Sequence, residues 1–208
     1  MENLKLIIDK TQPVINVVMS GVGGQGVLVA SDILVLVTMH VGLDAKKSEI
    51  HGMAQRGGSV VSQVRYGEKI YSPLIQMGTA DVILAFEKLE AIRYLDYLKQ
   101  DGIIVINNQQ ITPLSVFFSN IPYPKNIEEI CEKKTDHIVI VDGIKIAEDI
   151  GNPRTINSVL LGALSNYLEF DEEHWMKAIA QRIPPKTIDL NRKAFEAGRL
   201  VSSELVIG

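Results

Sequence analysis

The 208 residues of this chain are enough for one α/β domain that buries roughly 70% of its unfolded surface, so its core needs no disulfide or metal. Apolar residues make up 46% of the sequence and charged residues 22%, which excludes a disordered chain. A net charge of −4 and a pI near 5.6 argue against a basic phosphate-binding face, so we expect no nucleic-acid partner.

The cysteine and histidine content limits the kinds of metal and redox site that this chain is able to form. Cys131 is the only cysteine, which excludes an internal disulfide and an iron–sulfur cluster held by this chain alone. The four histidines lack metal-ligand spacing: His40, His51, His137 and His174. No signal peptide is visible, and the longest apolar run, 33–39, is far shorter than the roughly 20 residues of a membrane-spanning helix. We expect a cytoplasmic protein with no metal site and no membrane partner.

The first third of the chain predicts a strand, a glycine-rich loop and a helix. Residues 15–19 have the apolar run of a buried strand, and residues 27–40 are apolar on most faces of a helix. A short strand is predicted over 45–50, and 59–66 has an imperfect alternation that predicts another. Gly67-Glu68 then predicts a tight hairpin to residues 69–72.

In the rest of the chain, strands and helices alternate again, and the last part is predicted to be helical. The expected elements are strands over 81–86, 102–107 and 138–141, and helices over 87–99, 126–134, 155–167, 171–182 and 187–204. Asp142-Gly143 is interpreted as a turn. We therefore predict a single Rossmann-like α/β domain over 1–208, with a mostly parallel sheet, an inserted β-hairpin and a helical C-terminal part from about residue 154.

The first loop fits the pattern G-x-G-x-x-G with Gly21, Gly23 and Gly26 at the end of a strand and the start of a helix, where backbone N–H groups favour an anion. This context is typical of a dinucleotide site. The ribose-binding acid is ambiguous, because Asp44 starts the next strand and Glu49 lies near its end. The alternative is a tight turn and close helix packing with no ligand.

Two further features favour a ligand or a subunit contact at these loops. Beside Gly24, the Gln25 amide at the helix start has little packing value and is able to hydrogen-bond a ligand or a neighbouring chain. In the second loop, Arg56 is suited to bidentate contact with phosphate or carboxylate, and Gly57 and Gly58 let backbone approach it. A solvated arginine beside a flexible hinge is the competing interpretation.

Three motifs carry a family resemblance: G-V-G-G-Q-G at 21–26, H-G-M-A-Q-R-G-G-S-V at 51–60 and N-S-V-L-L-G-A at 157–163. They resemble the gamma-type domain of 2-oxoacid:ferredoxin oxidoreductases, over about residues 14 to 168. The M-A-Q-R-G-G form is most similar to the beta subunit of indolepyruvate ferredoxin oxidoreductase.

The resemblance implies CoA-dependent oxidative decarboxylation of a 2-oxoacid to an acyl-CoA and carbon dioxide, with electrons passed to ferredoxin. Val141-Asp142-Gly143 lacks the first glycine of the thiamine diphosphate motif G-D-G, and Asn152 follows it too closely. Thiamine diphosphate, magnesium and iron–sulfur clusters are therefore expected on a larger partner subunit, and the isolated chain is expected to be inactive.

Two classes of function follow from the sequence. In the first, the chain is an auxiliary subunit whose loops face coenzyme A, another phosphate ligand or the partner chain, with no catalytic residue of its own. In the second, it is a stand-alone dinucleotide-binding oxidoreductase or sensor. A purely structural role in the same complex is a third possibility, and the identity of the 2-oxoacid stays open.

Overall fold

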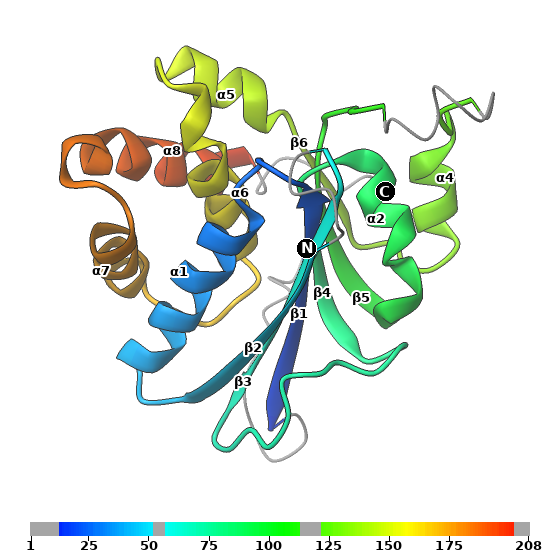
Figure 1. The fold of residues 1–208 in the computed structure, drawn as a ribbon, viewed down its shortest axis with the longest axis horizontal. Coiled ribbons are helices and arrows are strands. Elements are labelled where there is room, and N and C mark those ends of the chain that lie inside the picture. Colours follow the sequence, from blue (N-terminus) through cyan, green and yellow to red (C-terminus); the bar gives the residue numbers. More distant parts are fainter. Residues whose placement is uncertain (1–12, 52–56, 113–121, 202–208) are drawn as a thin grey trace.

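A six-stranded sheet forms the centre of the computed structural model, which describes residues 13–51, 57–112 and 122–201 (Figure 1). The strand order is β2-β3-β1-β4-β5-β6. The strands are β1 (Val14–Val22), β2 (Asp44–His51), β3 (Ser59–Gly67), β4 (Ala80–Ala85), β5 (Leu98–Asn107) and β6 (Ile138–Val141).

Strand β3 is the one that runs against its neighbours. It pairs antiparallel with β1 on one side and with β2 on the other, whereas β1-β4, β4-β5 and β5-β6 are parallel pairs. The sheet is therefore mostly parallel, as the sequence predicted, and β3 lies antiparallel between β2 and β1.

Helices cover both faces of this sheet. In Figure 1, α1, α6, α7 and α8 lie on one side of the sheet, and α2 and α4 lie on the other. The helices are α1 (Val27–His40), α2 (Lys88–Arg93), α4 (Ile127–Glu132), α5 (Gly143–Asp149), α6 (Ile156–Ser165), α7 (Glu172–Arg182) and α8 (Ile188–Val201). The described residues also include short 3₁₀ helices: η1 (Leu95–Tyr97) between α2 and β5, η2 (Pro153–Thr155) between α5 and α6, and η3 (Pro185–Thr187) between α7 and α8.

The core is divided by the sheet into two parts. In β4, Val82 and Leu84 face the larger cluster, and Ile83 and Ala85 face the smaller one. Because both faces of the strand are buried, its sequence is a continuous apolar run rather than an alternating one. The strand expected at 81–86 therefore lies within one residue of β4.

The hairpin predicted between 59–66 and 69–72 is wrong. Both edges of β3 are already occupied, by β1 and by β2, so residues 69–72 have no strand edge to join. Side chains hold this segment instead, since Asp44 accepts a hydrogen bond from the Ile70 amide and Gln63 accepts one from the Ile75 amide, both at 2.8 Å. The antiparallel connection runs from β2 to β3.

Two helix boundaries also differ from the prediction. The helix expected over 87–99 ends at Arg93, and β5 begins at Leu98, which pairs with Ala80 of β4 and has a fully buried side chain. Asp142-Gly143, interpreted as a turn, is the start of α5, with Asp142 at the N-cap. The predicted helix over 187–204 matches α8 as far as Val201, and residues 202–208 lie outside the described residues.

Among the described residues, no helix combines the length and apolarity needed to cross a bilayer. Helix α6 is instead buried within the domain and packs closely on α8. A Cβ atom added at Gly162 would lie 2.1 Å from the Phe195 carbonyl oxygen, and one at Gly198 would lie 1.9 Å from the Val159 carbonyl oxygen. Glycine at both positions is therefore required by the close approach of two helix backbones.

We expect Gly162→Ala to destabilise the chain by about 3 kcal/mol, because backbone atoms of α8 have to move to admit the methyl group. Helix propensity alone predicts the opposite sign, a gain of up to about 1 kcal/mol. Urea unfolding of the purified chain measures the difference. Gly42→Ala is the control, since open space surrounds Gly42 and only its positive φ of 80° costs energy. A Gly162→Ala chain as stable as the wild type would contradict this packing.

Candidate functional site

The candidate site lies at the carboxyl ends of the parallel strands. After β1 the chain enters α1 on one face of the sheet, and after β4 it enters α2 on the other face (Figure 1). The gap between the ends of β1 and β4 is thus a topological switch point, where open α/β sheets bind ligands. Both glycine-rich loops predicted from the sequence are attached to this edge.

The two loops are joined by backbone hydrogen bonds. The Gly23 amide donates to the Gly58 carbonyl oxygen at 2.8 Å, and the Gly57 amide donates to the Gly23 carbonyl oxygen at 3.4 Å. These bonds continue the ladder of β1 and β3, which ends at the pair Val22 and Ser59. Arg56, one residue before Gly57, lies outside the described residues.

The glycines of the first loop have different physical roles. A Cβ at Gly21 would lie within 2.9 Å of Val27, Phe86 and Gln25, and one at Gly26 would lie 2.2 Å from the Asn157 amide nitrogen. These two positions are required by close packing, which is the ligand-free interpretation of the motif. Gly24, with φ of 105°, has nothing within 4 Å of its Cβ position and faces open space.

The Gln25 side chain turns inward across the switch point. Its Oε1 accepts from the Val22 amide at 2.6 Å, and its Nε2 donates to the Phe86 carbonyl oxygen at 2.9 Å and to Gln109 Oε1 at 2.8 Å. One amide therefore ties the end of β1 to the ends of β4 and β5. Its contact with a ligand or a neighbouring chain stays a prediction, while its internal role is visible in the structure.

Two asparagines extend this polar layer. Asn107, fully buried at the end of β5, donates to the Phe86 carbonyl oxygen at 3.0 Å and accepts from the Gly143 amide at 3.1 Å. Asn157 of α6 donates to the Gly26 carbonyl oxygen at 3.3 Å. The loop before α1 is consequently held from the sheet and from the C-terminal helices.

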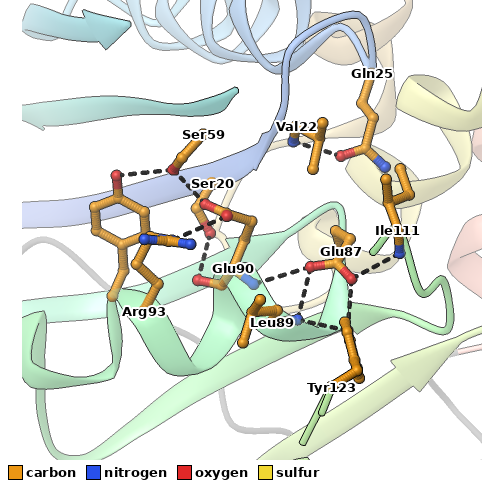
Figure 2. A network of polar contacts seen from close by, with 11 residues as sticks. Ser20, Val22, Gln25, Ser59, Glu87, Leu89, Glu90, Arg93, Ile111 and Tyr123 are labelled. Carbon is orange, nitrogen blue, oxygen red and sulfur yellow. Dashed lines mark hydrogen bonds and ion pairs between the residues drawn. The ribbon is translucent and has the colours of Figure 1, made fainter. Parts of the chain in front are cut away.

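The first turn of α2 carries the buried carboxylate of Glu87, which is 1% exposed (Figure 2). Its Oε2 caps the helix by accepting from the Leu89 and Glu90 amides, at 2.7 and 3.1 Å. Its Oε1 accepts from the Ile111 amide at 2.9 Å and from the Tyr123 hydroxyl at 2.5 Å. Burial and the Glu87 carboxylate raise the pKa of Tyr123, so this hydroxyl stays protonated and donates.

Glu90, three residues after Glu87 and also in the first turn of α2, is the second buried carboxylate and is 2% exposed. It accepts from the Ser59 hydroxyl at 2.5 Å and from Arg93 Nε at 3.0 Å. Burial raises the pKa of Glu90 above its usual value; the hydrogen bonds from Ser59 and Arg93 oppose the rise, and the charge of Glu87 adds to it.

The acids considered for a ribose contact lie elsewhere. Glu49 is on β2, which β3 separates from β1, so two strand spacings of about 5 Å each lie between the two strands. The Glu49 carboxylate pairs with Lys47 at 2.5 Å, and Asp44 accepts from the Ile70 amide. A dinucleotide fold instead places its acid on the strand beside β1. The geometry therefore argues against the stand-alone dinucleotide alternative.

The described residues show no cluster of metal-ligating side chains at this edge. No three histidine, cysteine, aspartate or glutamate side chains in that part of the chain are grouped to hold a metal ion. Cys131 is buried in α4, and burial together with Glu128 and Glu132 raises its pKa to about 11, so the thiol is protonated at neutral pH. The polar side chains described at this edge hold backbone groups of the loops and strand ends in place through hydrogen bonds.

Comparison with known proteins assigns this architecture to a family. The family model described as pyruvate ferredoxin/flavodoxin oxidoreductase matches residues 16–201. The chain is 40% identical to indolepyruvate oxidoreductase subunit IorB of Thermococcus kodakarensis over 92% of this chain and 97% of that protein. It is 39% identical to the subunit of the same name from Pyrococcus horikoshii, with the same two coverages.

Solved structures show the same fold at lower identity. The gamma subunit of a keto/oxoacid ferredoxin oxidoreductase from Geobacter sulfurreducens aligns with a TM-score of 0.67 at 24% identity, covering 92% of this chain and 99% of that one. The 2-oxoglutarate:ferredoxin oxidoreductase from Magnetococcus marinus aligns with a TM-score of 0.73 at 21% identity, covering 93% of this chain and 32% of that one.

The chain belongs to the pyruvate ferredoxin/flavodoxin oxidoreductase family, as a subunit of a multi-subunit 2-oxoacid:ferredoxin oxidoreductase. Sequence reasoning identified the glycines that meet at this edge but missed the polar groups that hold them: Glu87, Glu90, Asn107, Gln109 and Asn157. Glu87 and Asn107 directly follow or end apolar strand runs, and that position was the available signal. Glutamate is not a preferred N-cap residue, so helix-start rules did not select it.

We expect Gln25→Glu to destabilise the chain by about 2 kcal/mol, because a carboxylate oxygen would then face the Phe86 and Gln109 acceptors that the amide nitrogen now serves. Urea unfolding measures this loss. Gln181→Glu is the matched control, since Gln181 is exposed and its amide oxygen contacts only the His40 ring; it should change stability by less than about 0.5 kcal/mol. Equal effects of the two substitutions would contradict the internal role of Gln25.

The raised pKa of Glu90 predicts a pH dependence. Because the folded-state pKa lies above the ordinary value of 4.5, the carboxyl contributes most favourably below that pH, and its contribution falls as the pH rises through the folded-state pKa. Glu90→Gln cannot titrate. Its free energy of unfolding should therefore improve relative to the wild type as the pH rises from 4.5 through the folded-state pKa of Glu90, as measured by urea titrations at a series of pH values. A difference that stays constant, or that changes in favour of the wild type, would contradict this assignment.

Proposed function

We propose that this chain is the auxiliary subunit of an indolepyruvate or related aryl-pyruvate:ferredoxin oxidoreductase. In that reaction a 2-oxoacid and coenzyme A give an acyl-CoA and carbon dioxide, and the two electrons released pass to ferredoxin. The identity of about 40% to indolepyruvate oxidoreductase subunits, over nearly their whole length, supports the substrate class. The same comparison supports a larger partner subunit, because those relatives are themselves named as subunits.

We infer that the cofactors of this reaction are held by that partner. Thiamine diphosphate with magnesium supplies the electron sink for decarboxylation, and iron–sulfur clusters carry the electrons. The residues of this chain do not fit these groups, because its one thiol is buried in α4 and the carboxyl edge of its sheet carries amides and inward-facing carboxylates. No step of the chemistry is assigned to a side chain of this subunit.

In catalysis, the role of this chain is to form one wall of a coenzyme A site. The amino end of α1 has Gly26 at its N-cap, with no side-chain cap and no acidic residue in its first turn, so its free amides favour a phosphate. Gly24 and Gly57 leave open space where a side chain would stand, so a ligand is able to approach their backbone. The Magnetococcus marinus relative was solved with coenzyme A bound, which agrees with this ligand class.

The observation that carries this proposal is the pair of hydrogen bonds between Gly23, Gly57 and Gly58, because they bring both glycine loops to one place beside α1. Arg56 adjoins Gly57 in sequence, and we propose that its guanidinium binds a coenzyme A phosphate. Closing this wall over the partner's active site would also exclude water from a reactive intermediate.

Arg56→Ala in the assembled enzyme should raise the KM for coenzyme A about tenfold or more, because a charge-assisted hydrogen bond to phosphate is lost. The KM for the 2-oxoacid should change by less than about twofold, since that substrate is bound mainly by the partner. Steady-state kinetics of ferredoxin or viologen reduction measures both values.

Arg199→Ala is a matched control, because Arg199 pairs with Glu172 between α7 and α8, away from the carboxyl edge of the sheet. Neither KM should change in that variant. If Arg56→Ala left both the coenzyme A KM and partner binding unchanged, the assignment of Arg56 would be wrong.

A further inference from the structure

Glu90 is hydrogen-bonded to both strands that lead to the glycine loops. Its backbone carbonyl oxygen accepts from the Ser20 hydroxyl of β1 at 3.1 Å, and its carboxylate accepts from the Ser59 hydroxyl of β3 at 2.5 Å. Figure 2 shows these contacts meeting at the first turn of α2. Ser20 directly precedes Gly21, and Ser59 directly follows Gly58.

The Glu90 carboxylate is itself fixed from several directions. Arg93 Nε donates to its second oxygen at 3.0 Å, and the Tyr94 hydroxyl lies 3.3 Å from the Ser59 hydroxyl that it holds. The amide of Glu90 is bound by the Glu87 cap. With 2% of the residue exposed, little solvent competes for these bonds.

A buried carboxylate at this position lowers the stability of the fold, which points to a further role. Burial penalises its charged form, and an apolar side chain of similar size would fill the same volume without that penalty. The carboxyl group instead gives the Ser59 hydroxyl a directional acceptor at the first residue of β3.

We propose that Glu90 is a positioning residue that acts through Ser59 to hold Gly57 and Gly58 in register against Gly23, and so sets the spacing of the two loops for coenzyme A. The inference rests on the proposed function of those loops. The Glu90–Ser59 bond fixes β3 at its first residue, immediately after the two backbone hydrogen bonds that join the loops. Loss of the bond frees the end of β3 and loosens both loop contacts.

The test uses the assembled enzyme with coenzyme A as the probe. Ser59→Ala and Glu90→Gln should each raise the KM for coenzyme A about tenfold, the size of effect that misplacement of a binding group by a fraction of an ångström produces. The KM for the 2-oxoacid should stay within about twofold in both. Ser59→Thr keeps the hydroxyl and should restore the coenzyme A KM to within about threefold of the wild type.

Ser158→Ala is the matched control for a purely structural effect. Its hydroxyl also donates to a buried acceptor, Asn191, at 2.7 Å, but between α6 and α8. It should lower the melting temperature about as much as Ser59→Ala does and leave the coenzyme A KM unchanged. If Glu90→Gln failed to assemble, Ser59→Ala and Ser59→Thr would decide the question.

The outcomes separate the two proposals. An unchanged coenzyme A KM in Ser59→Ala, with a raised one in Arg56→Ala, would overturn the positioning role of Glu90 and leave the proposed function intact. Unchanged values in both variants would overturn both. A rise in Ser158→Ala as large as that in Ser59→Ala would also overturn the positioning role, because general destabilisation would then account for the effect.

Discussion

Strand β3 runs antiparallel to β1 along its length, from the pair Val14–Gly67 to the pair Val22–Ser59. It therefore occupies the place beside β1 that a dinucleotide-binding fold gives to the strand after its first helix. Two consequences follow from this one pairing. The acids of β2 are moved away from the first loop, and the second glycine loop is brought against it through Gly23 and Gly58. The site that we propose for this subunit is thus made of two loops rather than of one loop and an acid.

The first loop is also closed from within. Gln25 spans the ends of β1, β4 and β5, and Asn157 fills the space beside Gly26. A fold that binds dinucleotides leaves this crevice open for the pyrophosphate. Here the side-chain amides of Gln25 and Asn157 bind the chain's own backbone on the inner side of the loop, and the open positions at Gly24 and Gly57 face outward. An outward-facing pair of open backbone positions is consistent with the proposal that this subunit shares its ligand with another chain.

Sequence patterns predicted the local features and missed those that depend on tertiary pairing. The helix over Val27–His40 and the strands at β1, β4 and β6 follow from apolar runs and glycine punctuation, which are local. The partner of β3 depends on a contact distant in sequence, so the predicted hairpin was wrong. The sequence pointed to the two glycine motifs, whose ligand or subunit contact stays a prediction. It did not point to Glu87 and Glu90, because a buried glutamate on a short helix resembles a solvated one in sequence.

We propose that the two glycine loops form one wall of a coenzyme A site that the partner subunit completes. Hydrogen exchange followed by mass spectrometry tests it directly, with peptides covering 20–28 and 52–60 compared in the isolated chain and in the assembled enzyme. We expect assembly to slow exchange in both peptides, and coenzyme A to slow it further only in the complex. Protection by NAD in the isolated chain, or no response of either peptide to coenzyme A in the complex, would contradict it.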